Sequence, residues 1–153
     1  MPASRFHVPF ERTLVFDGSP GDLWDAIAVL VRRNDFDERL FRYDLHGRPL
    51  ETGSTVDVEV TPPLPYRVRL QIQFSESIRP SEIKIAIRGD VDGVGSVRLL
   101  PRGEKTHVIA TWNVELVQPA MRTVARVAYP IVVWGQDLAV DAIVRAFRRQ
   151  LPS

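Results

Sequence analysis

Apolar and polar residues alternate through much of this chain and then change to a helical spacing near its end. Between residues 54 and 116, apolar side chains recur at every second position, as in Val68, Leu70 and Ile72. This alternation predicts strands with one dry face and one wet face. From about Pro119 to Gln150 the apolar residues recur at helical intervals instead, which predicts one long helix.

The N-terminal part predicts a strand followed by a helix. The strand is expected from about residue 5 to residue 16, and Arg12 interrupts its apolar face. A helix is expected to begin at Ser19-Pro20-Gly21-Asp22, which combines a capping residue with a proline suited to the first helical position. It should fade near residues 33–35, with a second short turn reaching Glu38. The apolar residues that should face inward are Phe6, Val8, Phe10, Leu14 and Phe16 on the strand and Leu23, Trp24, Ile27, Leu30 and Val31 on the helix.

The middle of the chain predicts six or seven antiparallel strands, counting the first. The later strands are expected near residues 40–45, 56–60, 68–74, 83–87, 97–99 and 108–116. The glycine-rich segment 89–95 should turn or bulge before Val97, and residues 102–105 should form a hairpin turn. Short connections favour a meander, and its dry face needs a cover.

The terminal helix is the only large candidate for that cover. Pro130 lies inside it and should kink it near Arg126. Much of one helix face is small, so we expect room to be left between the helix and the sheet. Counted at 100° per residue, that face holds Met121, Val124, Ala125, Ala128, Val132, Gly135, Ala139, Ala142, Ile143 and Ala146.

Composition describes an ordinary soluble domain. With 153 residues, 44% of them hydrophobic, the chain is expected to form one domain, residues 1–153. A net charge of +1 gives no field that would recruit nucleic acid. The absence of cysteine suits a cytoplasmic location and rules out disulfides and thiol catalysis. Arg126, Asp137 and Asp141 interrupt the most apolar stretch, which argues against a membrane span.

An ordered set of short motifs resembles the START-like superfamily, which includes polyketide cyclases and dehydratases, lipid-transport proteins and birch-pollen-allergen-like proteins. The matching motifs are Pro20-x-Asp22-Leu23-Trp24-x-x-Ile27, Gly53-Ser54, Leu64-Pro65-Tyr66-Arg67, Gly89-Asp90-Val91-Asp92-Gly93-Val94-Gly95 and Thr106-x-Val108-x-x-x-Trp112-x-Val114. The resemblance implies an α+β helix-grip fold: a curved antiparallel sheet around a long C-terminal helix, with two short helices after the first strand. It also implies a cavity for an apolar or polyaromatic small molecule, and it transfers no catalytic residue.

Arg12 is the sharpest candidate for ligand recognition. An inward guanidinium could hold a ligand carboxylate or enolate by a bidentate contact. The alternative is that Arg12 lies near a sheet edge and reaches water or pairs with a carboxylate, because an unpaired buried charge is costly.

Aromatic residues are the second group of candidates. Trp112, Tyr129 and Trp134 could stack on a flat ligand, or they could simply pack in the core. Trp24 is expected to be structural. The predicted ligand-binding set is Arg12, Phe74, Trp112, Tyr129, Val132, Trp134 and Ala139.

No strong catalytic or metal signature emerges. Asp90 and Asp92 are spaced like a carboxylate pair, but a solvated glycine turn explains them as well. His7, His46 and His107 lie on separate predicted elements without ligand spacing, so no metal or other cofactor is expected.

Three functions remain open from the sequence. The first is binding of a hydrophobic small molecule for storage, transport or sensing, by a monomer or homodimer. The second is a polyketide cyclase or dehydratase acting in the same cavity, which would need an acid or base within reach of its substrate. The third is an interaction module whose interior is filled by its own side chains.

Overall fold

The computed structural model describes residues 6–33 and 39–151 of the chain. The elements follow in the order β1 (His7–Asp17), α1 (Pro20–Arg33), β2 (Phe41–His46), β3 (Thr55–Val60), β4 (Val68–Ile78), β5 (Glu82–Gly89), β6 (Val91–Arg102), β7 (Lys105–Leu116) and α2 (Pro119–Gln150). The predicted order of strands and helices is confirmed over this part of the chain. The expected short turn reaching Glu38 lies outside the described residues.

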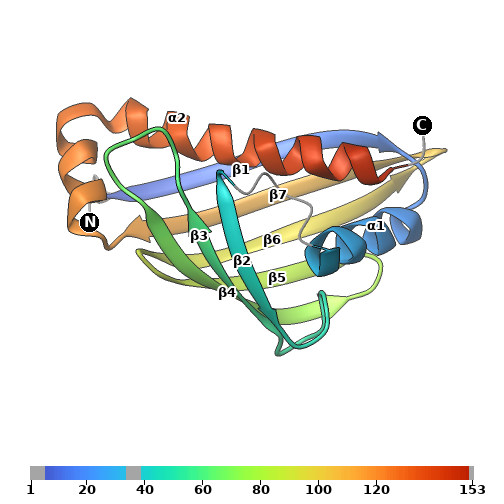
Figure 1. Cartoon of the computed structure of the whole chain (residues 1–153). Coiled ribbons are helices and arrows are strands. Elements are labelled where there is room, and N and C mark those ends of the chain that lie inside the picture. Colours follow the sequence, from blue (N-terminus) through green and yellow to red (C-terminus); the bar gives the residue numbers. More distant parts are fainter. Residues whose placement is uncertain (1–5, 34–38, 152–153) are drawn as a thin grey trace.

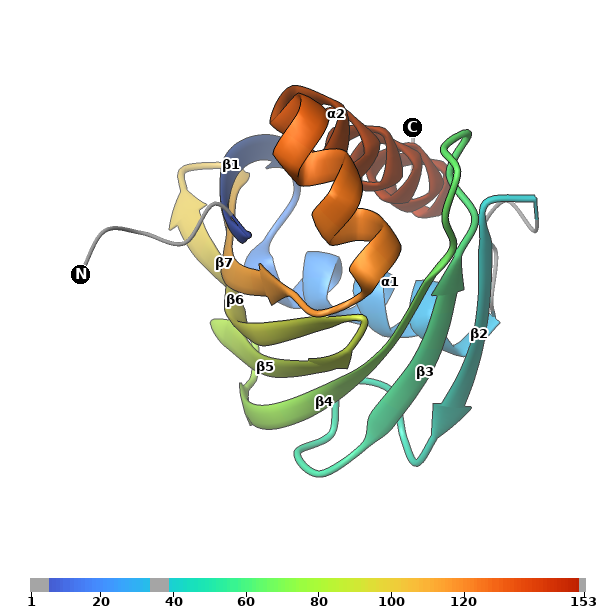
Figure 2. The same cartoon turned by 90° about the vertical axis from the view of Figure 1, so that its left-hand side faces the viewer.

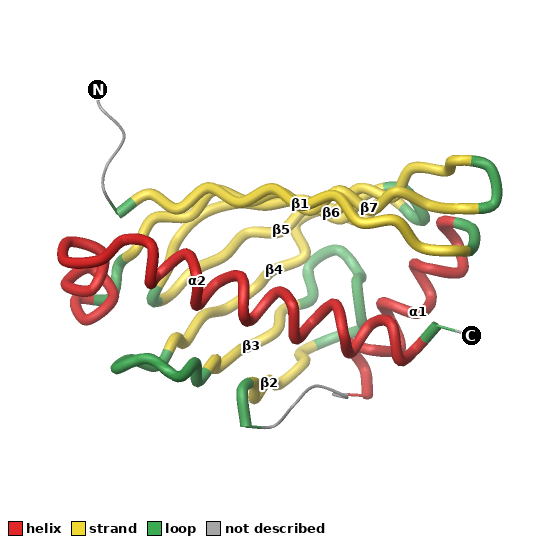
Figure 3. Tube along the Cα trace, turned by 90° about the horizontal axis from the view of Figure 1, so that it is seen from above, coloured by secondary structure: helices red, strands yellow, loops and turns green. Residues whose placement is uncertain are grey.

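The strands form one antiparallel sheet in the order β1-β7-β6-β5-β4-β3-β2. From β2 to β7, strands that are consecutive in the chain pair with each other, so the predicted meander is confirmed, and β1 pairs with β7. The sheet curves around α2, which lies across its concave side (Figures 1 and 2). Seen from above, α2 passes between the β1 edge and the β2 edge of the sheet (Figure 3). This is the expected helix-grip arrangement.

The glycine-rich segment 89–95 corrects one expectation. Only its start turns, since Gly89 ends β5 with φ of 128° and β6 already begins at Val91. Gly95 lies inside β6 and pairs with Trp112 on β7. A Cβ added at Gly95 would come within 2.8 Å of the Trp112 Cβ, so this glycine makes room for the neighbouring indole instead of forming a turn.

Helix α1 closes one end of the sheet. The Ser19 hydroxyl accepts a hydrogen bond from the Asp22 amide at 3.2 Å, as the capping sequence predicts. Trp24 is 6% exposed and packs in a core cluster with Phe74 and Ile83, so its structural role is confirmed. Side chains therefore fill the end of the bowl beneath α1.

Helix α2 is kinked just before Pro130, as predicted, and the distorted residue is Ala128. Ala128 has non-helical angles of φ −152° and ψ 72°. Pro130 has no amide hydrogen for the carbonyl of Arg126, and its ring crowds that carbonyl. The backbone relieves the crowding at Ala128, between these two residues.

The kink divides α2 into a short first part and a long second part (Figure 1). In the first part, Met121 and Ala125 are buried in one core cluster with Val8 on β1. The second part runs along the sheet, and Ala146 and Phe147 near its end pack with Leu23 of α1. The helix reaches a mean hydropathy of 1.4 over 18 residues, enough for a membrane span by length and composition, but in this fold it covers the sheet.

Candidate ligand-binding cavity

A cavity of about 250 Å³ lies between the concave face of the sheet and α2. All seven strands and α2 contribute side chains to its wall, and α1 contributes none. The volume falls just below the ~300–1,000 Å³ typical of small-molecule pockets. The interior of the bowl is therefore not filled by the protein's own side chains.

The strand side of the wall follows from the alternation in the sequence. Every second residue of β4 and β5 faces inward, so Leu70, Ile72, Ile85 and Ile87 form an apolar floor. Branched aliphatic side chains are stiff and present hydrocarbon only. This floor can bury apolar ligand surface but cannot orient a ligand by hydrogen bonds.

The helix side of the wall is a stripe on the second part of α2. Its residues recur at spacings of three and one, as one face of a helix requires: Val132, Gly135, Gln136, Ala139, Val140 and Ile143. A Cβ added at Gly135 would come within 2.7 Å of Leu64 in the β3–β4 loop, so this glycine lets the loop pack on the helix. The small residues of the stripe leave the space that forms the cavity.

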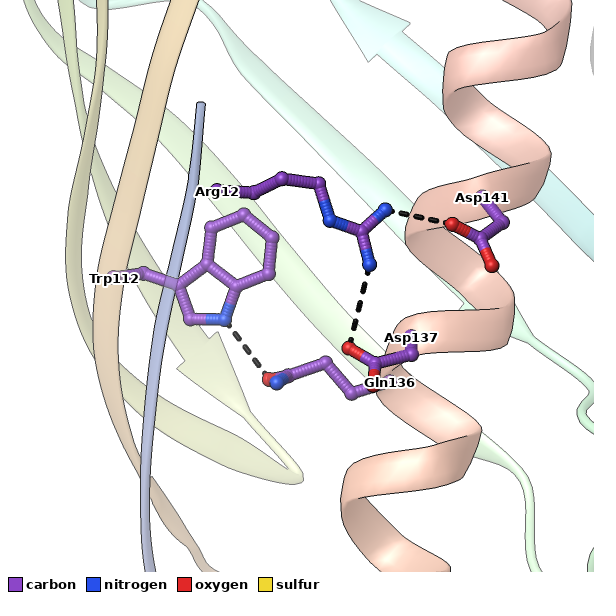
Figure 4. A network of polar contacts seen from close by, with 5 residues as sticks. All are labelled: Arg12, Trp112, Gln136, Asp137 and Asp141. Atoms are coloured by element: carbon purple, nitrogen blue, oxygen red, sulfur yellow. Dashed lines mark hydrogen bonds and ion pairs between the residues drawn. The ribbon is translucent and has the colours of Figure 1, made fainter. Parts of the chain in front are cut away.

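Trp112 belongs both to the core and to the cavity wall. Its ring stacks on Phe10 with centroids 3.9 Å apart and planes 10° apart. Its indole nitrogen donates a hydrogen bond to Gln136 Oε1 at 3.0 Å (Figure 4). Trp112 therefore both packs in the core and lines the cavity. Its indole is held by Phe10 of β1 on one side and by Gln136 of α2 on the other.

Arg12 does not line the cavity. Its guanidinium donates to Asp141 Oδ1 at 2.7 Å and lies 3.5 Å from Asp137 Oδ1 (Figure 4). The alternative interpretation is the correct one: β1 is an edge strand, and Arg12 pairs with carboxylates. Because α2 runs beside β1, two acidic residues one helical turn apart reach the arginine.

Three other predicted ligand-binding residues also lie outside the cavity wall. Tyr129 follows the kink, and its hydroxyl donates to the His7 carbonyl at 2.8 Å. Trp134 is 50% exposed, because the α2 face that covers the cavity points the other way. Phe74 lies at the end of the bowl filled by α1, where it packs with Trp24. Of the predicted set, the structure places Trp112, Val132 and Ala139 in the wall.

Two polar wall residues, Tyr66 and Gln136, are absent from the predicted set. Tyr66 lies in the Leu64-Pro65-Tyr66-Arg67 motif, which carries the resemblance but gives no role to the phenol. Gln136 lies one turn after Val132 on an apolar helix face, and a polar amide on such a face indicates a residue that can contact a ligand. Counted at 100° per residue from Met121, Gln136 falls on the same side of the helix as the predicted face, but it is polar and a count of apolar and small residues leaves it out.

Tyr66 is a buried phenol at the inner surface of α2. The residue is 9% exposed, and its hydroxyl oxygen would lie 3.7 Å from a Cβ added at Gly135. Burial raises the pKa of the Tyr66 phenol above its ordinary value, so the group stays protonated at neutral pH. Within residues 6–33 and 39–151, no hydrogen-bond partner for this hydroxyl is found.

The wall carries no formal charge over the described part of the chain. Its polar side chains are Tyr66, Trp112 and Gln136, and the rest are apolar. Asp90 and Asp92, the candidate carboxylate pair, serve the turn instead: Asp90 accepts hydrogen bonds from the Arg69 amide and from Gln118, and Asp92 accepts one from the Gly89 amide.

The histidines lie apart from the cavity and from one another. His7 contacts Asn113 at 3.1 Å, and His46 contacts Asp57 at 2.9 Å. His107 is half-buried on β7 and does not line the cavity. Among the described residues, no group of three or more His, Cys, Asp or Glu side chains converges as a metal site would require.

A second hollow, of about 540 Å³, lies on the outer face of β2, β3 and β4. About half of its lining residues are charged, and several of these pair with neighbouring side chains. Glu59, for example, lies within 3.7 Å of Arg67 and 3.5 Å of Arg69. This surface is a solvated outer face, and the apolar cavity is the better candidate for a binding site.

Comparison with known proteins supports the fold independently of the sequence motifs. No protein-family profile matches the chain, and no curated protein sequence does. Solved structures match over nearly its whole length. Norcoclaurine synthase from Thalictrum flavum superposes with a TM-score of 0.64 at 13% identity, covering 94% of this chain and 85% of that one.

Two bacterial proteins superpose to a similar degree. One from Thermus thermophilus gives a TM-score of 0.66 at 16% identity, covering 94% of this chain and 95% of its own. One from Rhizobium loti gives 0.65 at 19% identity, covering 95% and 97%. Identities this low establish a shared fold and nothing further. With its curved sheet, kinked C-terminal helix and a cavity between the two, the chain has the START-like, helix-grip fold that its sequence motifs resemble.

Proposed function

We propose that the protein binds a small hydrophobic molecule in the cavity between the sheet and α2. The observation that supports this most is the cavity itself: about 250 Å³ of space with an almost wholly apolar wall. Burial of apolar ligand surface contributes about 25 cal/mol per Å², so each 100 Å² adds about 2.5 kcal/mol before the cost of association. The norcoclaurine synthase structure, which holds dopamine and hydroxybenzaldehyde, gives a precedent for aromatic ligands in this fold.

The wall favours binding over catalysis. A cyclase or dehydratase needs an acid or base near its substrate. Among the described wall residues, Tyr66 is the titratable one, and its raised pKa makes the phenol both a poor base and a weaker acid than an ordinary tyrosine at neutral pH. The interaction-module alternative requires a filled interior, whereas the structure has an open one. A cytoplasmic location and a monomeric or homodimeric state stay predictions of the sequence.

Native mass spectrometry of protein purified from its own host tests this proposal. We expect a fraction of the protein to carry a non-covalent adduct that denaturation releases as a neutral, apolar compound. Titration with the apolar fluorescent probe 1-aminoanthracene gives the second readout, with saturable fluorescence enhancement expected. Protein that carries no adduct and takes up no probe would show that the cavity is not a binding site.

A further inference from the structure

The cavity wall presents hydrogen-bond donors that the protein does not use. The Tyr66 hydroxyl lies at the inner surface of α2 beside Gly135, in a residue that is 9% exposed. Among the described residues it has no hydrogen-bond partner, and it is not one of the fully buried polar atoms, so its oxygen is accessible from the cavity. A ligand atom that accepts this hydrogen bond would replace water there.

Gln136 adds donors next to the same point of the helix. The indole nitrogen of Trp112 can only donate, so the Gln136 oxygen must face it, at 3.0 Å (Figure 4). That contact fixes the amide so that its nitrogen, with two donors, is left for another partner. Within the described residues no such partner is found.

Charge near this wall excludes an anionic ligand. Arg12 is the cation of the adjacent network, and two carboxylates, Asp137 and Asp141, already hold it (Figure 4). The group as a whole carries a net negative charge. A ligand carboxylate would enter an apolar cavity without a counter-ion, which is strongly unfavourable.

We infer that the cavity selects an uncharged ligand whose apolar body carries one carbonyl oxygen. The oxygen accepts hydrogen bonds from the Tyr66 hydroxyl and the Gln136 amide nitrogen, and the aliphatic floor of β4 and β5 holds the apolar body. A carbonyl oxygen offers two lone pairs, so it can accept a hydrogen bond from the hydroxyl and one from the amide nitrogen at the same time. This inference rests on the proposed function and specifies the ligand class for that same site.

Three matched naphthalene compounds separate the inference from the function on which it rests. They are 2-acetylnaphthalene, 2-isopropenylnaphthalene, in which a methylene replaces the carbonyl oxygen, and 2-naphthoate, which is an anion at neutral pH. By isothermal titration calorimetry we expect the ketone to bind about fivefold to 150-fold more tightly than the alkene, the range for two neutral hydrogen bonds. The naphthoate should bind more weakly than the ketone.

Tyr66→Phe removes one donor and keeps the ring. In this variant the affinity for the ketone should fall by about threefold, while the affinity for the alkene stays unchanged. Tyr43→Phe is the matched control, because the Tyr43 hydroxyl donates to the carbonyls of Leu30 and Val31 at the end of α1, away from the cavity. It should leave both affinities at their original values.

Each result bears on a defined claim. Equal binding of ketone and alkene, or tightest binding of naphthoate, would overturn the inferred ligand class and leave the binding function standing. A Tyr66→Phe variant that loses both ligands alike would show that the phenol only shapes the cavity, which also overturns the inference. Failure of all three compounds to bind the unmodified protein would remove the proposed function as well.

Discussion

Filling the cavity from the helix side should weaken ligand binding strongly without unfolding the protein. Ala139 lies in the cavity wall on the long part of α2. Replacing it with Phe directs a ring into the space between helix and sheet. Burial of a Phe side chain contributes about 1.5–3 kcal/mol, and strain from overpacking costs about 1–3 kcal/mol. These terms nearly cancel, so the free energy of unfolding should change by less than about 2 kcal/mol.

The effect on binding should be much larger. A buried Phe side chain covers about 150–250 Å² of surface. If half of that area is taken from ligand contact, the ligand loses about 100 Å² of apolar burial, which corresponds to about 2.5 kcal/mol or a roughly 70-fold weaker affinity. Titration with 1-aminoanthracene measures the affinity, and urea unfolding measures the stability.

Ala120→Phe is the control for this experiment. Ala120 is exposed in the first turn of the same helix and lies outside the cavity wall. It receives the same ring without filling the cavity, so probe affinity should not change. An Ala139→Phe protein that remains folded and binds the probe as tightly as the original would show that the ligand space lies elsewhere.

Three further predictions concern the polar and aromatic residues near the cavity. Arg12→Met should lower the free energy of unfolding by about 1 kcal/mol. A double-mutant cycle with Asp141→Ala should give a coupling energy of about 0.2–1 kcal/mol that decreases as salt is added, because the Asp141 carboxylate is half exposed. A loss of probe affinity above about tenfold in Arg12→Met would instead identify the arginine as a ligand contact. Trp134→Ala should change probe affinity by less than about twofold, as an exposed substitution does, whereas Trp112→Phe should weaken it by about tenfold; the reverse order would contradict the placement of the cavity. The pKa of Tyr66 is raised in the folded state, so the unfolded phenol, with a pKa near 10, releases its proton first. The free energy of unfolding should therefore be unaffected below that pH and fall as pH rises from the unfolded-state pKa through the folded-state pKa. Urea unfolding from about pH 9 to about pH 11 should show a smaller loss of stability in Tyr66→Phe, and identical profiles would argue that the phenol is solvated.

The strands could be predicted because their information is local. Alternation along β4 and β5 places Leu70, Ile72, Ile85 and Ile87 on one face whatever their neighbours are, and short connections leave little choice except a meander. The start of α1 was predictable for the same reason, since its cap is a contact between Ser19 and a residue three positions later.

The cavity wall on α2 could be predicted only in part. The sequence indicates small residues such as Ala139 and a break at Pro130, but it does not give the backbone angles that relieve the break. Counting from Met121 does identify Val132, Gly135, Ala139 and Ile143, all of which line the cavity. Gln136 lies on the same side of the helix, but a search for apolar residues passes over it. Trp134 is apolar, but it lies on the opposite side and points outward.

Contacts between distant elements explain the remaining differences. Arg12 shares the inward parity of β1, and only the path of α2 along this edge strand reveals that Asp137 and Asp141 reach it. Gly95 lies in a glycine-rich segment that predicts a turn, yet its role is to make room for Trp112, its partner on the neighbouring strand. The alternation of a strand predicts which residues can face inward, but it does not predict which residues of other elements they will contact.

A crystal structure determined under xenon pressure would show whether the space between sheet and helix exists, because xenon enters dry apolar cavities. We expect xenon between the β4–β5 floor and α2, within contact of Ile72, Ile87 and Val132. An interior closed by side chains, with no xenon between sheet and helix, would contradict this expectation.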